Sequence, residues 1–212
     1  MALPAQSKWI DITMEFGSPA GTWPGDAPFR TGWTSRLGDK RMGVNLTMFS
    51  SSPHNGTHSD APLHVMEGGA ASESLDVEAY LGDCVVVDAT KGLDTVDAKV
   101  LPKKPSQERI LFKTRVGPPL DAFPHRFKGF SLELAQEIVR RKVRLVGTDA
   151  PSVDRADLNG LRAHHILFEG RVAFMENLDL SRVEPGAYEL VALPLKVSGL
   201  CAAPVRALVR PK

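Results

Sequence analysis

The stretch SLELAQEIVRRKVRLVGT (131–148) predicts a helix that is followed at once by a strand. Ser131 is a natural helix N-cap, Glu133 favours the first turn, and the basic residues 140–142 favour the last turn. The apolar positions recur with helical spacing, and they are Leu134, Ala135, Ile138 and Val139. The run VRLVGT (143–148) is short, β-rich and bounded by turn residues, as strands are. Both kinds of regular structure are therefore expected within one short segment.

Short β-rich runs of the same kind occur along the rest of the chain. They are WIDITMEF (9–16), GVNLTMFS (43–50), CVVVDA (84–89), RILFK (109–113), RVAFME (171–176), AYELVALP (187–194) and PVRALV (204–209). In GVNLTMFS the alternate valine, leucine and methionine share one face. Further helices are expected in LDVEAYLG (75–82) and in ADLNGLRAHHILFEG (156–170), each of which ends at a glycine. Because strands outnumber helices, the sequence predicts a compact α+β single domain over residues 1–212, with a mixed β-sheet core and a few flanking helices.

Composition and charge exclude several classes of protein. The chain has 212 residues and a formal net charge of +1 without a long basic run, so neither nucleic acid nor an anionic membrane is an implied partner. No apolar stretch approaches the roughly 20 residues that span a bilayer. The first 16 residues lack the continuous apolar segment of a signal peptide. We therefore expect a cytoplasmic protein whose partner is a small molecule.

The two cysteines, Cys84 and Cys201, give no disulfide framework. Cys84 opens CVVVDA and Cys201 lies in GLCAAPV, and both surroundings are apolar. We expect buried, unreactive thiols at both positions. The alternative is a nucleophilic thiol beside a histidine.

The stretch SPHNGTHSDAPLH (52–64) holds three of the six histidines of the chain. Four of its polar side chains are separated by four, two and four residues: His54, His58, Asp60 and His64. Side chains an even number apart share one face of an extended chain, so these four can converge. Proline and the Asn-Gly pair argue against a helix, and we expect a shaped loop whose glycine permits a tight bend. Imidazole and carboxylate groups together suit zinc or a similar first-row divalent ion.

Two other interpretations of this stretch are a solvated polar loop and a closed structural metal site. A single histidine in a loop is usually only solvated, but three with an aspartate, in a chain of six histidines, favour a metal. Structural sites are typically closed and rich in cysteine. Because this stretch has no cysteine and keeps a carboxylate, it favours a catalytic metal site with a position open to water.

Further ligands must come from elsewhere in the chain. His164 and His165 are adjacent, and neighbours on a helix point about 100° apart, so we expect only one of them to face a given metal. Glu176 follows twelve residues after His164 and ends an apolar run, where a buried acid needs a partner such as a cation. A solvated Glu176 just past the strand is the alternative. His125, in FPHRFKG, has no obvious partner and is expected to be solvated.

At these residues the sequence resembles the metal-dependent cyclase family, which includes bacterial kynurenine formamidases, isatin hydrolases and polyketide-type cyclases. The stretch from His54 to His64 matches the family motif HxGTHxDxPxH, and the later HH...ENL matches its second motif. Softer similarities to the formamidase branch are TWPGDAPF (22–29), AYLGDCVVVD (79–88) and VGTDAPSVD (146–154). The resemblance covers nearly the whole chain. It implies a compact α+β fold of the swivelling β/β/α type and an assembly that is a homodimer or larger.

The same resemblance implies two zinc ions per subunit, or another divalent metal such as manganese. The implied ligands are His54, His58 and Asp60 for the first ion, and the bridging Asp60 with His164 and Glu176 for the second. His64 would be the acid–base residue, and His165 is the fallback ligand for His164. Trp23 would lie against an aromatic substrate, and its alternative role is a hydrophobic anchor beneath its loop.

The implied reaction is the hydrolysis of N-formyl-L-kynurenine to L-kynurenine and formate, an arylformamidase step of tryptophan degradation. A metal would make hydroxide available, and His64 would protonate the leaving nitrogen. The alternatives are an isatin hydrolase or another hydrolase of the family, a serine hydrolase, and a non-catalytic metal-binding module. A serine hydrolase needs an elbow such as G-x-S-x-G. The nearest stretch, GFSLE (129–133), lacks the last glycine and is typical of a helix cap.

Overall fold

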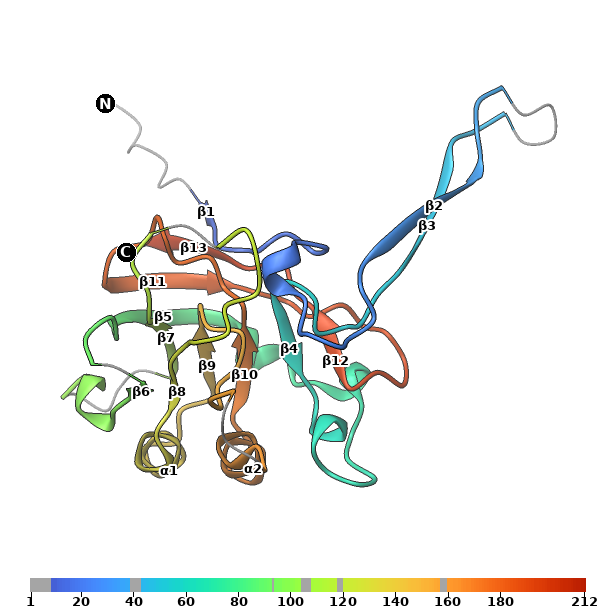
Figure 1. Cartoon of the computed structure of the whole chain (residues 1–212). Helices are drawn as coiled ribbons and strands as arrows, with labels where there is room; N and C mark the ends of the chain where they lie inside the picture. Colours follow the sequence, from blue (N-terminus) through green and yellow to red (C-terminus); the bar gives the residue numbers. More distant parts are fainter. Residues whose placement is uncertain (1–8, 39–42, 93, 104–107, 118–119, 157–159) are drawn as a thin grey trace, which may run out of the picture.

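A computed structural model of the chain describes residues 9–38, 43–92, 94–103, 108–117, 120–156 and 160–212. Its centre is a mixed nine-stranded sheet with the order β1-β13-β11-β5-β7-β9-β10-β4-β12 (Figure 1). In that order the strands are Ile10–Asp11, Leu208–Pro211, Gly186–Val191, Leu81–Asp88, Arg109–Lys113, Leu145–Thr148, Ala173–Glu176, His58–Asp60 and Ala202–Pro204. Strands β5, β7, β9 and β10 run parallel to one another, and all other neighbours in this sheet are antiparallel.

Within the described residues, two α-helices and two short sheets accompany the central sheet. The helices are α1 (Leu132–Arg140) and α2 (Arg162–Glu169), and Figure 1 shows them side by side against one face of the parallel strands. The short sheets pair β2 (Arg30–Ser35) with β3 (Leu46–Ser50), and β6 (Thr95–Val96) with β8 (Gly129–Phe130). Single 3-10 turns are Pro19–Gly21, Pro62–His64, Ser72–Ser74, Val77–Tyr80 and Ala98–Val100. Among the described residues no helix has the length and apolarity to cross a membrane.

The parallel strands are buried on both faces, which is why they read as nearly continuous apolar runs. On β7, Ile110 and Phe112 face the helices and pack in one cluster with Leu134 of α1. Leu111, between them, belongs to a second cluster with Leu190 on the other side of the sheet. Each such fully buried side chain stabilises the fold by about 1.5–3 kcal/mol. The prediction of an α+β fold with a mixed sheet and flanking helices is confirmed.

Two of the three predicted helices are confirmed as α1 and α2. The Ser131 hydroxyl accepts a hydrogen bond from the Leu134 amide at 3.1 Å, as an N-cap does. Three of the four predicted apolar positions of α1 are buried and Val139 is partly buried. The helix ends before Lys142, which takes a left-handed φ of 56°. Helix α2 stops at its C-cap, Gly170.

Three predictions differ from the observed elements. In 75–82 only Val77–Tyr80 is helical, and Gly82 is not a helix stop, because it lies in β5 with a φ of 112° opposite Leu190. The run 204–209 is divided between β12 and β13, because Val205 turns to donate a hydrogen bond to the Thr57 carbonyl at 3.0 Å. In 9–16 only β1 is a strand of the sheet.

The histidine stretch is not a loop throughout, so that prediction was wrong in part. His58–Asp60 form β4, whose three residues are buried between β10 and β12. No apolar run marks this strand, because its side chains are polar and serve a site instead of an apolar core. The even spacing that places His58 and Asp60 on one face holds, since it is a property of any extended chain.

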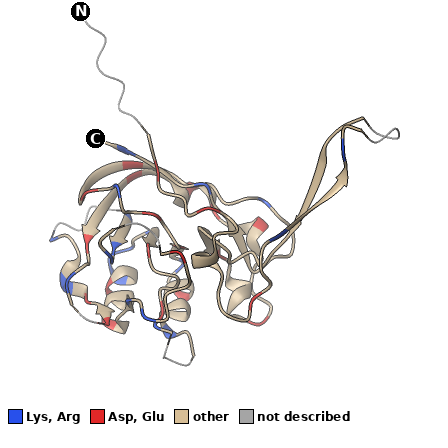
Figure 2. Cartoon of the chain, turned by 45° about the horizontal axis from the view of Figure 1, so that its top comes forward, with Lys and Arg blue, Asp and Glu red and all other residues tan. Residues whose placement is uncertain are grey.

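A two-stranded arm, formed by β2 and β3, projects from the body of the molecule (Figure 1). The strand predicted in 43–50 is confirmed as β3, but its apolar side chains are not covered within one chain. Leu46 is 40% exposed, Met48 56% and Phe49 62%. Figure 2 shows acidic and basic residues scattered over the body and few charges on the arm. The arm is therefore an extension of the fold that carries few charges and exposes apolar side chains.

Candidate metal centre

Strand β4 positions two of the predicted site residues. His58 and Asp60 alternate with Ser59 and lie on the same face, where they are 2% and 0% exposed. The His58 Nε2 atom lies 3.2 Å from Asp60 Oδ1. Ser59 points to the opposite face, where its hydroxyl lies 2.7 Å from the Tyr80 hydroxyl. The period-2 spacing of the motif thus separates the site from the core behind it.

A tight turn before β4 brings His54 back to Asp60. Gly56 adopts a φ of 63°, and a Cβ atom there would lie 2.8 Å from the Glu15 carbonyl oxygen, so only glycine fits. The turn brings His54 Nδ1 to within 3.0 Å of Asp60 Oδ1. The bend that the sequence predicted from its glycine is confirmed.

Two distant elements bring the remaining predicted ligands to Asp60. Glu176 is the last residue of β10 and pairs in register with His58, whose Nε2 lies 3.4 Å from Glu176 Oε2. His164, on α2, places its Nε2 at 3.3 Å from Asp60 Oδ2 and 3.6 Å from Glu176 Oε1. The structure brings His164 into the cluster and leaves the adjacent His165 outside it, which is the choice that the spacing favoured.

Each carboxylate oxygen of Asp60 faces a different histidine set. Oδ1 lies near His54 and His58, and Oδ2 lies near His164. Despite these short distances, neither oxygen has a hydrogen-bond partner of acceptable geometry, and both are fully buried. A buried carboxylate without a partner is costly, and a cation on either side of it would satisfy it. The donor set of imidazole nitrogen and carboxylate oxygen therefore fits divalent metal ions.

A second layer of polar groups orients the cluster. Asp154 Oδ2 lies 2.6 Å from His164 Nδ1, and the two Asp154 carboxylate oxygens accept hydrogen bonds from the Ala163 and His164 amides. Glu176 Oε1 accepts one from the Val153 amide at 2.7 Å. Carboxylates behind a ligating histidine fix its ring orientation in metal sites. Asp154 was not among the predicted site residues, although it is the last residue of VGTDAPSVD.

Protons are held strongly by the buried imidazoles. Burial by itself lowers the pKa of His58, but the adjacent Asp60 and Glu176 carboxylates outweigh it and raise the pKa to about 10. The same balance of burial against carboxylates, first Asp154 and then Asp60, raises the pKa of His164 to about 10. For His54, with Asp60 as the main partner, the pKa rises to about 9. The carboxylates thus create a field that stabilises positive charge in their midst.

All members of the cluster except the central Asp60 line a cavity of about 500 Å³. His64, which the resemblance implies as the acid–base residue, lies at the side of this cavity, with Nε2 at 4.0 Å from Asp60 Oδ2. Its side chain is 29% exposed, more than that of any other histidine in the cluster. A ring that is close to the carboxylates and still open to the cavity can meet both a substrate and solvent.

Aromatic side chains form another wall of the cavity. Trp23 lines it and is 37% exposed. Its ring meets those of Phe123 and Phe127 edge to face, with centroids 5.0 and 6.1 Å apart. Phe123 also lines the cavity, and nothing in the local pattern FPHRF distinguishes it from a packing residue. The exposed tryptophan is thus part of the cavity wall and not an anchor hidden beneath its loop.

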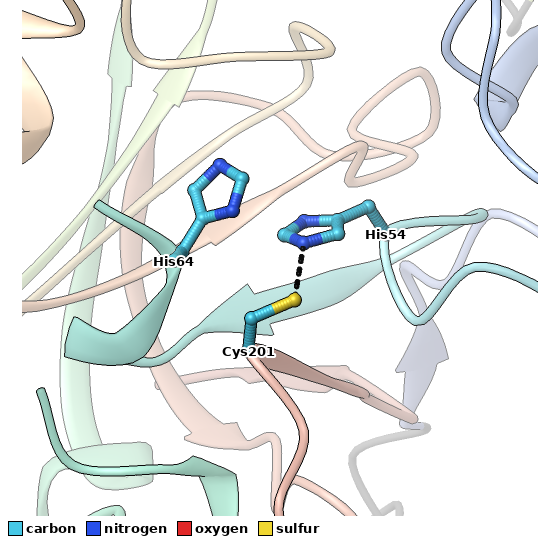
Figure 3. Close-up of side chains that lie close together, drawn as sticks. All are labelled: His54, His64 and Cys201. Carbon is cyan, nitrogen blue, oxygen red and sulfur yellow. Dashed lines mark hydrogen bonds between the residues drawn. The ribbon is translucent and has the colours of Figure 1, made fainter. Parts of the chain in front are cut away.

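Cys201 corrects the prediction of two buried, unreactive thiols. It lies at the cavity with its Sγ atom 3.2 Å from His54 Nε2 (Figure 3). Contacts with His54 and then His64 outweigh burial and lower the pKa of the Cys201 thiol to about 6. Cys84 fits the prediction, because it is 1% exposed and burial raises its pKa to about 12. The apolar neighbours of Cys201 in sequence concealed its polar neighbours in space.

The positions of Ser131 and His125 bear on two other expectations, the serine-hydrolase alternative and a solvated His125. Ser131 of the stretch GFSLE caps α1 and does not line the cavity, so the stretch nearest to a serine-hydrolase elbow supplies no nucleophile there. His125 is exposed, as expected, and contacts the ring of Phe123 at a centroid distance of 6.3 Å.

Comparisons with known proteins agree with this geometry. The Cyclase family model matches residues 10–155. The kynurenine formamidase of Salinibacter ruber is 40% identical over 95% of this chain and 96% of its own, and that of Bacillus anthracis is 36% identical over 97% and 98%. A structure described as a "predicted metal-dependent hydrolase" from Bacillus stearothermophilus is 28% identical, with a TM-score of 0.81 over 98% of this chain and all of its own. Isatin hydrolase A of Labrenzia aggregata, at 22% identity, shares the fold with a TM-score of 0.76 over 96% and 93% of the two chains. The chain therefore belongs to the Cyclase family.

Proposed function

We propose that this protein is a metal-dependent amidohydrolase that converts N-formyl-L-kynurenine to L-kynurenine and formate in tryptophan degradation. The relatives named kynurenine formamidase support this reaction, since they match over nearly the whole chain. The observation that carries the proposal is the buried Asp60 carboxylate, whose oxygens make no hydrogen bond and face imidazoles on both sides, beside an aromatic-walled cavity that His54 and His164 line. Such a cavity suits an aryl formamide.

Two divalent cations are part of the proposal. His54, His58 and Asp60 would hold the first, and Asp60, His164 and Glu176 the second. Zinc suits this donor set, and manganese is an alternative. When bound, such ions lower the pKa of water and stabilise negative charge on oxygen. Asp154 would hold His164 in the orientation that presents its Nε2 atom.

His64 is the proposed acid–base residue. The anilide nitrogen of the substrate is a poor leaving group unless it receives a proton as the C–N bond breaks. His64 lies beside the carboxylate cluster and opens to the cavity, so its ring can take a proton from water and deliver it to that nitrogen. A positioned group of this kind typically contributes about 10²–10⁴-fold to the rate.

Trp23 is the proposed contact for the aryl ring of the substrate. It lines the same cavity as His54 and His64, and Phe123 supports its ring edge to face. Aromatic pairs of this geometry contribute about 0.5–1.5 kcal/mol beyond the burial of their area. The Trp23 ring is therefore held in place by its neighbours before any substrate arrives.

One purified sample tests the reaction. Its metal content is measured, and the same sample is assayed with N-formyl-L-kynurenine and with isatin, before and after treatment with a chelator. We expect bound divalent metal and hydrolysis of the formamide that the chelator abolishes. Faster turnover of isatin would replace this proposal with the isatin hydrolase alternative, and metal binding without turnover of either compound would favour a non-catalytic module.

A homodimer and a cytoplasmic location belong to the same proposal. The arm supports the dimer, because an isolated two-stranded ribbon is marginal in water and this one exposes Trp33, Met48 and Phe49 by 50%, 56% and 62%. A second copy of the chain, in a closed two-fold arrangement, would cover these side chains. Light scattering of the parent and of the double variant Trp33→Ser, Phe49→Ser tests the dimer. We expect the parent to be a dimer and the double variant a monomer, and a monomeric parent would refute the proposed dimer.

The proposed cytoplasmic location is supported by the two free thiols, which fit a reducing compartment.

A further inference from the structure

A second group of metal-binding side chains lies beside the centre described above. His54, His64 and Cys201 each offer a ligand atom, and these atoms lie within 4.8 Å of one another. They come from three segments: the turn before β4, the 3-10 turn Pro62–His64, and the residue before β12. Figure 3 shows the three side chains gathered together, with the His54 Nε2 atom in contact with the Cys201 sulfur.

We propose that His54, His64 and Cys201 form a separate binding position for thiophilic divalent cations, and that its occupation inhibits the enzyme. A thiolate with two imidazoles prefers softer cations than a carboxylate-containing set does. Three protein ligands also leave a fourth position open to water, as in other tetrahedral sites. All three residues line the cavity, so a cation can reach them from solvent.

The sheet fixes the backbone that carries the Cys201 thiol. The Cys201 carbonyl accepts a hydrogen bond from the Ala61 amide at 2.8 Å, and the next residue, Ala202, pairs with Asp60 across β12 and β4. The backbone of Cys201 is thereby fixed relative to the carboxylate cluster. Its Sγ atom faces His54 as a consequence of strand register.

The new position competes with the first metal position for one imidazole. His54 presents Nδ1 to Asp60 at 3.0 Å and Nε2 to Cys201 at 3.2 Å. A neutral imidazole has only one nitrogen with a free lone pair, so His54 serves one cation at a time. A cation held by Cys201 would therefore draw His54 away from Asp60.

The same cation would also occupy His64. A ligated imidazole cannot pass a proton to a leaving group, so binding here would stop the step proposed for His64. This inhibitory part rests on the proposed function, whereas the binding of the cation does not. Binding and inhibition therefore need separate measurements.

The binding test uses Cd²⁺ and the absorption of its thiolate complex. The metal-free parent is titrated with Cd²⁺, and the ultraviolet charge-transfer band of cadmium–thiolate is followed. Only Cys201 can contribute at the cavity, since the carboxylate-centred ligand set contains no sulfur. We expect the band in the parent and in the control Cys84→Ser, and its loss in Cys201→Ser. A parent without the band, or a band that persists in Cys201→Ser, would overturn the proposal.

The inhibition test compares the same three proteins after loading with zinc. Half-inhibition of formamide hydrolysis should need roughly tenfold more Cd²⁺, or more, in Cys201→Ser than in the parent, because even the loss of an outer-shell partner costs about 10–100-fold in metal affinity. Cys84→Ser should match the parent. Equal sensitivity of all three proteins would refute the inhibitory role. If the parent hydrolyses no formamide, the proposed function fails, while the cadmium–thiolate band still decides the binding position.

Discussion

Asp60 and His164 lie 104 positions apart in the sequence, yet His164 Nε2 is 3.3 Å from Asp60 Oδ2. One side chain comes from the polar strand β4 and the other from helix α2. The contact joins the two sequence motifs into one cluster, and it gives the second Asp60 oxygen a nitrogen that β4 itself does not supply. The proposed centre for two cations depends on this contact.

The tandem histidines provide a matched pair of variants. His164→Gln should lower the metal content from two ions per chain towards one, because it removes the nitrogen that faces Asp60 and Glu176. His165→Gln changes the adjacent residue outside the cluster and should keep the parent metal content. Elemental analysis of both purified variants checks this. Loss of metal in the His165 variant alone would move the second position to the fallback ligand.

Asp60→Asn should remove both metal ions and the activity together. The carboxylate faces both halves of the cluster, so its loss should weaken binding by more than the roughly 10–100-fold that an outer-shell partner contributes. Asp83→Asn, at an exposed position of β5, is the control for loss of one negative charge. Metal analysis and the formamide assay are made on the same samples. Full metal content in Asp60→Asn would contradict the bridging role.

The sequence predicted the parts of the site that depend on spacing along the chain. The even separation of His58 and Asp60 places them on one face of any extended segment, and Glu176 ends a recognisable apolar strand. Helix α1 was predictable for the same reason, since its cap and apolar positions are local. β4 was not recognised as a strand, because its polar residues lack the apolar alternation by which strands are identified.

Other parts of the site depend on proximity in space that the sequence does not encode locally. Cys201 has apolar sequence neighbours, and only the pairing of β12 with β4 brings it to His54. Asp154 serves the site through His164 of the following helix, ten residues on. Phe123 reaches Trp23 from a loop between β7 and β8. Each of these contacts follows from how the chain folds in space and not from a local pattern in the sequence.

His64→Ala separates metal binding from catalysis. We expect this variant to keep the parent metal content, since the carboxylate-centred ligands remain, and to lose about 10²–10⁴-fold in kcat because the leaving nitrogen receives no proton. Steady-state kinetics and elemental analysis are the measurements. Hydrolysis at the parent rate would show that another group protonates the nitrogen.

Asp154→Asn tests the positioning of His164. The variant keeps the size of the side chain but removes the charge that faces His164 Nδ1 at 2.6 Å. We expect a loss of about 10–100-fold in the affinity for the second ion, measured by competition with a chelator. If Asp154 served only as a cap for α2, the unfolding midpoint would fall while the affinity of the folded protein stayed at the parent value.

The buried histidines predict how the stability of the metal-free protein depends on pH. Their pKa values rise from 6.5 to between about 9 and about 10 on folding. A raised pKa stabilises the folded state fully below about pH 6.5, and this stabilisation is lost as the pH rises through the folded values. With a chelator present, the urea midpoint should therefore fall between pH 6.5 and pH 9.

One group acts in the opposite sense and has to be removed for this measurement. The pKa of Cys201 falls from 9.0 to about 6 on folding, so its contribution to stability grows over the same pH range. The titration is therefore made in a Cys201→Ser background. In that background His164→Gln should make the decrease of the urea midpoint with pH smaller, because it removes one of the protonated imidazoles. His165→Gln should leave this decrease unchanged. A midpoint that is independent of pH would show that the cluster does not hold these protons, and the carboxylates would then lack the field on which cation binding depends.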